Sequence, residues 1–143
     1  MVHALEKIHQ ILKPDGILLD IHPTNEPAAM AVRLREQIIP AGWLNESDDY
    51  VEYEWADEAL QRLVDDQRFV LERVGTFEFV WHADSLKDLR AYLAEEWQDA
   101  IIDDVTAMHI EELLKLPVSD KEILVSEAIR IARYRRLTPN PLT

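Results

Sequence analysis

The 143 residues carry 28 acidic and 15 basic side chains, a net charge of −13, with 48% hydrophobic residues and no cysteine. A chain of this length can bury about two-thirds of its unfolded surface in one core, so the sequence predicts a single domain over residues 1–143. The acidic charge disfavours nucleic acid and anionic membranes as partners, and the lack of cysteine excludes disulfides and thiolate metal sites. With no signal-peptide pattern and no apolar run that could cross a bilayer, we expect a cytoplasmic protein.

A helix, a tight turn and a buried strand are predicted first. Apolar residues recur at helical spacing over about residues 2–12, and Pro14 stops the pattern because the residue before proline disfavours helical backbone. Asp15 and Gly16 form the turn. The apolar run 17–22 hardly alternates, which is typical of a parallel strand covered on both faces. This order of elements indicates an α/β protein.

The middle of the chain mixes helical and irregular patterns. Apolar residues at every fourth position predict a helix over about 27–39, and a second helical stripe runs from Ala56 to about Asp66. Between them, the stretch from Asn45 to Glu54 is acidic and aromatic without a clear period. We therefore expect a loop there.

The C-terminal part predicts a strand, two helices and a final strand. Residues 69–82 are rich in Phe, Val and Trp, and Gly75 within them indicates a bulge or bend. Ser85 opens a helix with a capping-box pattern, and a further helix ends at Pro117. The apolar stripe predicted to face inward on this further helix consists of Ile101, Val105, Met108 and Leu113. The remaining segment, to about Arg136, fits a short helix or a strand, and we favour the strand.

The string from Ala4 to Asp20, with its Leu-Lys-Pro-Asp-Gly turn, resembles a late-domain signature of class I S-adenosylmethionine-dependent methyltransferases. In that family a helix, a Leu-Lys-Pro-Gly-Gly-like turn and an apolar strand form the fourth helix and fifth strand of a Rossmann-like sheet. Asp15 stands where the first glycine is common. The segments 77–86 and 127–136 are similar to the family's C-terminal portion. The resemblance implies a partial Rossmann-like fold with a small mixed sheet of about three strands flanked by helices.

The glycines show which part of that family the chain resembles. The family holds its cofactor with a glycine-rich loop after the first strand and an acidic residue at the end of the second. The chain has only three glycines, isolated at 16, 42 and 75, so no cofactor-binding residue can be carried onto it. We therefore expect neither S-adenosylmethionine binding nor catalysis by the chain alone. The resemblance implies the substrate side of a small-molecule methyltransferase, in a homodimer or with a partner chain that completes the fold.

Four residues are candidate substrate contacts, and no residue stands out as catalytic. Asp20 and His22 end the apolar strand, at the sheet edge where open α/β sheets bind ligands, or they are polar residues satisfied by loop amides. Trp43 and Tyr50, with Tyr53 and Trp55 nearby, either line a substrate pocket or belong to a satellite core.

Charged groups elsewhere have simpler interpretations. His82 and Asp84 have the spacing of a ligand pair, but a zinc site needs three or four ligands, so we expect no metal. A basic cluster near the C-terminus either pairs with the surplus carboxylates, which we favour, or receives an anionic ligand. Its members are Arg130, Arg133, Arg135 and Arg136.

Two other functions remain open beside the methyltransferase fragment. One is a non-catalytic oligomerisation or interaction module that has kept the fold without the chemistry. The other is a small ligand-binding domain unrelated to methyl transfer, which a pocket lined by His22, His82 and carboxylates would indicate. Residues 17–22 contain no proline or lysine to discourage edge pairing, so a free edge there predicts self-association.

Overall fold

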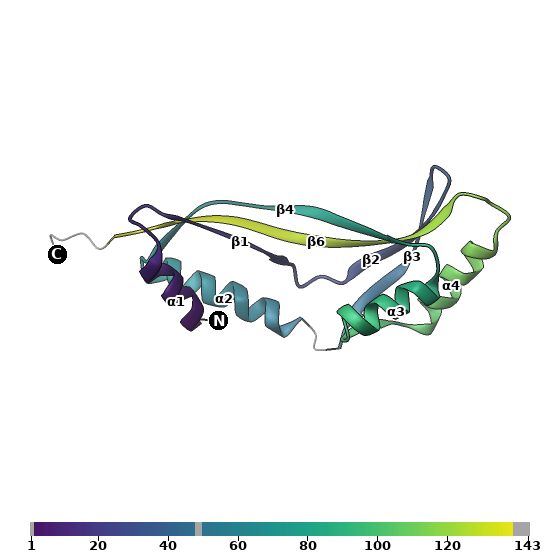
Figure 1. Ribbon diagram of the computed structural model, residues 1–143, viewed down its shortest axis with the longest axis horizontal. Helices are drawn as coiled ribbons and strands as arrows, with labels where there is room; N and C mark the ends of the chain where they lie inside the picture. Colours follow the sequence, from purple (N-terminus) through teal and green to yellow (C-terminus); the bar gives the residue numbers. More distant parts are fainter. Residues whose placement is uncertain (1, 48–49, 139–143) are drawn as a thin grey trace. The chain divides into compact units, whose positions relative to one another are not determined.

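The computed structural model describes residues 2–47 and 50–138 (Figure 1). Within these residues the chain forms four helices and a six-stranded antiparallel sheet of order β1-β6-β2-β3-β5, with β4 also paired to β6. The elements are α1 Val2–Ile11, β1 Ile17–Pro23, β2 Ala28–Leu34, β3 Gln37–Glu46, α2 Val51–Asp65, β4 Phe69–Ala83, α3 Leu86–Glu96, β5 Ala100–Ile102, α4 Asp104–Lys115 and β6 Lys121–Arg136. No helix in this described part is long and apolar enough to cross a bilayer.

The mixed helix and strand content predicted from the sequence is confirmed, but the sheet is larger than the predicted three strands. The extra strands come mainly from the region predicted as a helix over 27–39, which is the hairpin of β2 and β3. Burial along β2 alternates strictly, so Met30 and Leu34, four residues apart, also fit a period of two. Arg35, with φ of 57°, closes the hairpin turn. A spacing of four residues therefore also arises in a strand, from every second residue on its buried face.

The prediction that residues 17–22 form a parallel strand covered on both faces is wrong. β1 is a strand, but it pairs antiparallel with β6. Leu19 is 60% exposed and Ile21 is 57% exposed. An apolar run identifies a strand, but the number of layers that cover it depends on the rest of the chain.

The boundaries of the remaining elements follow the sequence with two corrections. β3 extends to Glu46 and α2 begins at Val51, so most of the predicted loop is regular structure. The inward stripe predicted from Ile101 is wrong except for Leu113, which packs against the core of unit 2. The reason is that β5 precedes α4 and that Asp103 caps α4 by accepting from the Thr106 backbone N–H. The predicted members Ile101, Val105 and Met108 are exposed, whereas Thr106, Ala107 and Ile110 are buried.

The predicted helix start at Ser85, the strand over 69–82 and the final strand are confirmed. Ser85 Oγ accepts the backbone N–H of Asp88 at 3.1 Å and so caps α3. β4 runs unbroken through Gly75, at which a Cβ would meet nothing within 4 Å.

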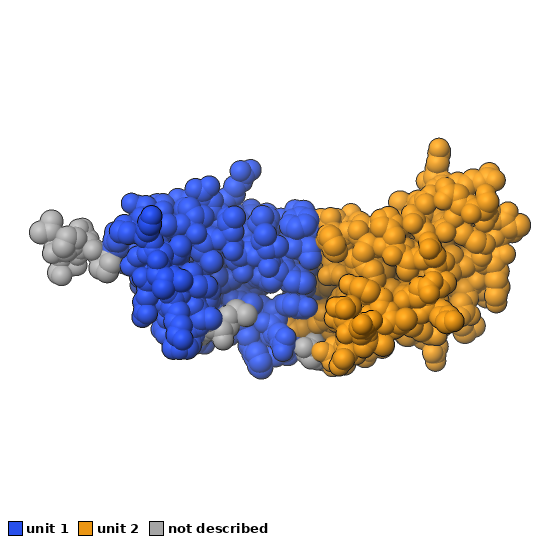
Figure 2. Space-filling model, in the orientation of Figure 1, with its two compact units in different colours: residues 1–25, 51–77, 129–143 blue, residues 26–50, 78–128 orange. Residues whose placement is uncertain are grey.

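The chain divides into two compact units, which Figure 2 shows in blue and orange. Unit 1 consists of residues 1–25, 51–77 and 129–143, and unit 2 consists of residues 26–50 and 78–128. β4 and β6 contribute residues to both.

In unit 1, α1 and α2 pack on one face of the strands. The core there combines Leu5 of α1 with three residues of α2 and with Phe69 of β4, Ala132 and Tyr134 of β6. The α2 residues are Ala59, Leu60 and Leu63. On the opposite face of this unit, which we call its bare face, the described residues include the exposed Leu19, Ile21 and Ile131.

In unit 2, α3 and α4 pack on one face of β2, β3 and β6. Its core includes Met30, Val32, Leu44, Leu89, Ile110, Ile123 and Val125, all at most 1% exposed. The side chains that alternate with these strand residues point to the other face. That other face, the bare face of unit 2, carries the larger of the candidate binding sites.

Candidate functional site

The covered face of unit 1 holds a cluster of charged side chains around His22. His22 Nδ1 lies 2.8 Å from Asp20 Oδ2, and its Nε2 lies 3.2 Å from Asp57 Oδ1 on α2. Arg130, directly opposite His22 in the strand register, donates from Nη1 to Asp20 Oδ2 at 3.0 Å and from Nη2 to Tyr134 OH at 3.0 Å. β1, β6 and α2 therefore each contribute to one network.

Apart from the half-exposed Asp57, the side chains of this network are largely shielded from water. The side chains of His22, Arg130 and Asp20 are 13%, 19% and 21% exposed. Burial by itself lowers the pKa of Arg130, but the hydrogen bond to Tyr134 and the charges of Asp57 and Asp20 outweigh it and raise that pKa. The Arg130 guanidinium therefore stays charged beside the two carboxylates.

Asp20 and His22 are thus brought together, as their places two residues apart on one strand allow. Their partners are side chains of α2 and β6, not the loop amides of the alternative interpretation. His22 Nε2 is buried and makes no hydrogen bond with good geometry, although Asp57 lies close to it. With His22 packed under the sheet and flanked by carboxylates, the cluster is suited to fixing α2 on the strands.

The neighbouring arginines pair with acids on the bare face of unit 1. Glu72 accepts from Arg133 Nε at 2.9 Å and from Arg135 Nε at 2.6 Å, and Arg135 lies 3.5 Å from Asp15. The hydrogen bond from Arg135, with that from Arg133, lowers the pKa of Glu72. Arg136 donates to the carbonyl oxygen of Leu12. The prediction that the basic cluster pairs with the chain's own carboxylates is confirmed for Arg130, Arg133 and Arg135.

Unit 2 carries a hollow of about 600 Å³ on the bare face of its sheet. Its floor and walls are almost entirely apolar, and Trp43, one of the predicted substrate contacts, is a wall residue that is 56% exposed. The lining consists of Ala29, Met30, Ala31, Ile38, Pro40, Gly42, Trp43, Glu78, Val80, Leu124 and Ser126. We name this feature the unit 2 hollow.

The strand register explains why the surface is concave. Ala29 lies between Trp43 of β3 and Ser126 of β6, and Ala31 lies opposite Leu124. Methyl side chains on the central strand leave a depression between larger side chains on both neighbours. The Ala-x-Ala pattern of β2 therefore determines the depth of the unit 2 hollow.

Of the described residues that line the unit 2 hollow, Glu78 alone carries a formal charge. Ser126 Oγ donates a hydrogen bond to Glu78 Oε1, so the carboxylate is held at one side of the unit 2 hollow. Trp43 and Val80 add aromatic and aliphatic surface. This set favours a ligand that is apolar and either neutral or positively charged.

A group of ion pairs lies two residues further along β2 and β6, on the same face as the unit 2 hollow. Arg33 Nε donates to Glu122 Oε1 at 2.7 Å, and both Nη atoms donate to Asp120 at 3.1 Å. His82, which with Asp84 has the spacing of a ligand pair, places Nδ1 3.1 Å from Glu122 Oε1. The hydrogen bond from Arg33 lowers the pKa of Glu122, which favours its ionised form. At this end of the face, one guanidinium is thus paired with two carboxylates.

Tyr50 and its aromatic neighbours Tyr53 and Trp55 do not line the unit 2 hollow. Tyr50 OH accepts the backbone N–H of Glu46 at 3.2 Å and so helps to end β3. Trp55 lies on α2 in unit 1 and is 62% exposed. The sequence analysis missed Ala29, Ala31 and Val80, because β2 was assigned to a helix and small residues carry no chemical signature.

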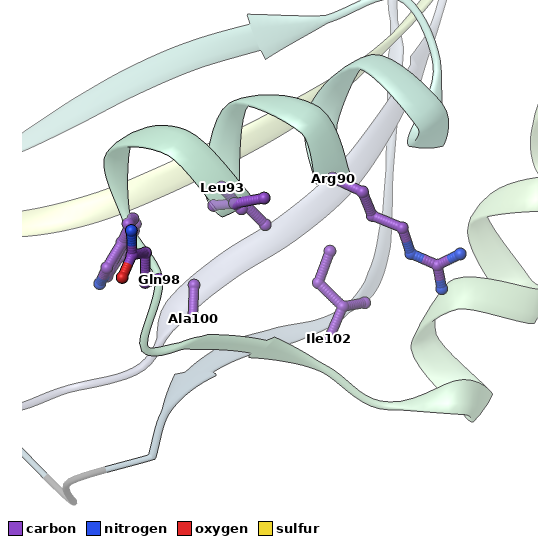
Figure 3. Close-up of a pocket in the computed structure, with 7 residues that line it drawn as sticks. Arg90, Leu93, Gln98, Ala100 and Ile102 are labelled. Carbon is purple, nitrogen blue, oxygen red and sulfur yellow. The ribbon is translucent and has the colours of Figure 1, made fainter.

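A smaller cavity of about 260 Å³ lies between α3 and β5 in unit 2 (Figure 3). Figure 3 shows Leu93, Ala100 and Ile102 lining it, with Arg90 extending toward its other end. Its lining consists of Arg90, Leu93, Ala94, Trp97, Gln98, Ala100 and Ile102. Trp97 Nε1 donates to the buried Glu46 at 3.1 Å, so its one indole donor is engaged within the fold. The unit 2 hollow, with more than twice this volume, is the better candidate binding site.

Among the described residues, no three His, Asp or Glu side chains are grouped as metal ligands. No protein-family model, curated protein or solved structure matches the chain.

Proposed function

We propose that the chain supplies the substrate side of an S-adenosylmethionine-dependent small-molecule methyltransferase, with the substrate held in the unit 2 hollow. The observation that carries this proposal is the hollow itself. Its volume of about 600 Å³ lies within the roughly 300–1,000 Å³ typical of small-molecule sites, and its lining is apolar with few polar groups. Asp20 and His22, held under the sheet of unit 1, have a supporting role.

The turn before β1 supports the methyltransferase part of the proposal. Asp15 has φ of 57°, in the left-handed region that glycine adopts most easily, at the position where that family commonly has glycine. A Cβ on Gly16 would lie 2.7 Å from the Lys13 carbonyl oxygen, so this second position requires glycine. The backbone therefore gives both positions the same demands as the family's Gly-Gly turn.

The neighbours of β1 give further support. In the resembled fold the fifth strand lies next to the seventh, and β1 pairs with the last strand of this chain, β6. The pairing of β1 with β6 is the part of the six-stranded sheet that corresponds to the resembled fold. The cofactor would be held by a partner, because no residue here matches the family's cofactor loop.

The substrate class follows from the charge of the lining. Glu78 repels anions, and the net charge of −13 adds to this effect, whereas Trp43 and Glu78 together attract a cation attached to an apolar body. We therefore expect a substrate with an aromatic or branched apolar part that is neutral or carries an amine.

Calorimetry with a matched pair of probes tests the proposed site. We expect 1-naphthylmethylamine to bind more tightly than 1-naphthoate, because the two share an apolar ring system and differ in charge. Ala31→Leu fills the floor of the unit 2 hollow and should abolish binding, whereas Val105→Leu, at a position 79% exposed on α4, should not. Binding that survives Ala31→Leu, or tighter binding of the acid, would contradict the proposed site.

Titration with S-adenosylhomocysteine tests the absence of a cofactor site. We expect no heat change at concentrations that would reveal a dissociation constant of about 10 μM, since such affinity, roughly −7 kcal/mol, requires a formed site. Affinity at or above that level for the chain alone would contradict the proposal that a partner holds the cofactor.

A non-catalytic interaction module is the second candidate function, and the unpaired edge of β1 favours it. An interaction module would bind neither naphthalene probe in the unit 2 hollow. Binding of the naphthalene probes therefore discriminates the two functions, because association through the strand edge is compatible with both.

A further inference from the structure

We propose that the chain forms a two-fold homodimer by antiparallel pairing of β1 with β1 of a second copy, centred on Leu19. This inference does not rest on the proposed function, because β1 belongs to unit 1 and the candidate binding site belongs to unit 2. A result that contradicts the dimer therefore does not contradict the proposed binding site, and the reverse also holds.

β1 offers an open backbone edge. Among the described residues its only strand partner is β6, and it stands at the end of the strand order. From Ile17 to His22 it is a regular strand with no proline or lysine, the residues that commonly protect edge strands. The unpaired N–H and C=O groups of such an edge are a template for another strand.

The strand is complementary to itself in one particular register. A two-fold axis perpendicular to the sheet keeps each side chain on its own face, and centring the axis on Leu19 sets the two copies of Leu19 directly opposite. Ile17 then faces Ile21 of the second copy. On the bare face, the two strands form one continuous strip of branched aliphatic side chains, which cross-strand packing stabilises.

The charges of β1 disfavour the neighbouring register. Centring the pair on Asp20 would place two carboxylates directly opposite each other, which is destabilising. In the register centred on Leu19, Asp20 faces Leu18 of the second copy and keeps its pairs with Arg130 and His22. The sequence of the strand therefore selects Leu19 as the centre.

A second copy fits this edge better than a strongly charged partner. Leu19 and Ile21 are more than half exposed, and they match an identical apolar strand. The net charge of −13 opposes association, but Arg130, Arg133 and Arg135 stand opposite β1 on β6, and each is paired with an acid. The charges around the edge are thus nearly balanced, and the more distant ones are screened beyond about 8 Å at physiological salt.

Single-cysteine variants test the register directly, because the chain has no cysteine of its own. With copper phenanthroline as the oxidant, Leu19→Cys should give a covalent dimer. Ile17→Cys alone and Ile21→Cys alone should not, since two copies of either residue would lie about 13 Å apart, at ~3.4 Å per residue, against the ~7 Å limit for a disulfide. A mixture of the Ile17→Cys and Ile21→Cys chains should again cross-link.

Light scattering tests the dimer without any oxidant. The unmodified chain should have about twice its 16.6 kDa mass at micromolar concentration. Leu19→Lys should raise the dimer dissociation constant at least tenfold while circular dichroism stays unchanged, and the control Val105→Lys, on exposed α4, should leave the mass unchanged.

Several results would overturn the proposal. A monomer mass for the unmodified chain would exclude the dimer, and equal cross-linking of all three single-cysteine variants would exclude a defined register. A dimer in which Leu19→Cys does not cross-link would place the interface elsewhere. If Leu19→Lys unfolds the chain, the cross-linking pattern of the conservative cysteine variants decides the outcome.

Discussion

Unit 1 and unit 2 are built from similar parts, since in each the helices pack on one face of a few strands, but they treat charge differently. Unit 1 places Asp20, His22 and Arg130 under its sheet with Asp57 of the covering helix. Unit 2 packs an almost entirely apolar core on its covered face. The buried Glu46 and the half-buried Glu127 each accept an indole N–H, from Trp97 and Trp81 respectively.

The bare faces differ in the opposite sense. In unit 1 the exposed aliphatic residues alternate with arginines paired to Glu72, whereas the unit 2 hollow contains one carboxylate and otherwise apolar groups. An apolar depression of about 600 Å³ open to water is unfavourable for a protein without an occupant. From this difference we propose that the charges of unit 1 orient its covering helix and that the apolar surface of unit 2 binds a ligand.

The largest effect is expected from the apolar core of unit 2. Leu89 of α3 is fully buried, so Leu89→Ala should lower the free energy of unfolding by about 2–5 kcal/mol, through lost apolar burial and the cavity that remains. Urea unfolding monitored by circular dichroism measures the change. Val105→Ala, at an exposed position of α4, is the control and should change stability by less than about 0.5 kcal/mol. A Leu89→Ala loss as small as the control's would show a loosely packed core.

Gly42→Ala should be the next most costly change, at roughly 1–3 kcal/mol. Gly42 has φ of 153°, and a Cβ there would overlap the Thr106 side chain on α4, so the sheet and this helix pack tightly at this position. Gly75→Ala is the matched control, because a Cβ there would meet open space. We expect Gly75→Ala to be neutral or slightly stabilising in the same urea assay, and equal losses for both glycines would contradict the close packing of β3 on α4.

Arg130→Gln tests how much the charged cluster around His22 stabilises unit 1. Removing this largely buried guanidinium leaves Asp20 and Asp57 without their cation, which should cost about 1–3 kcal/mol. Arg133→Gln, at a side chain 53% exposed, should cost less than about 1 kcal/mol because solvent screens its pair with Glu72. Denaturant unfolding of both variants at neutral pH measures the difference, and similar small losses would mean that the charges under the sheet do not hold α2 in place.

The smallest effects are expected from two glutamates whose pKa values are shifted in opposite directions. The hydrogen bond from Arg135 lowers the pKa of Glu72 below its usual 4.5, so the stability it contributes is present above about pH 4.5 and is lost as the pH falls through the lowered folded pKa. Burial raises the pKa of Glu127 above 4.5, despite the hydrogen bond from Trp81. Glu127 therefore costs stability progressively as the pH rises from about 4.5 through its raised pKa.

Unfolding measured from about pH 3 to about pH 8 separates these two groups. Glu72→Gln should flatten the acid loss of stability. Glu127→Gln should raise stability at neutral pH by under about 1 kcal/mol, because the amide oxygen still accepts from Trp81 without burying a charge. If Glu127→Gln instead flattened the acid loss of stability and Glu72→Gln raised stability at neutral pH, the directions of the two pKa shifts would be reversed.

Local chemistry allowed several elements to be predicted from the sequence by itself. Pro14 ends α1, the cap at Ser85 begins α3, and the β-branched and aromatic run beginning at Phe69 forms β4. The pairing of the C-terminal arginines with acids also followed from composition, because 28 carboxylates surround 15 cations. These features depend on neighbours within a few residues or on overall charge balance.

Only the tertiary structure decided which apolar positions are buried and where the candidate binding site lies. Met30 and Leu34 fit both a helix and a strand, and the pairing of β2 with β3 and β6 selects the strand. The unit 2 hollow depends on Ala29 and Ala31, which have no reactive groups and matter only because larger side chains flank them in the register. Asp57 meets His22 across thirty-five residues of sequence, at 3.2 Å. Such contacts are set by strand register and helix docking, which residue periodicity does not encode.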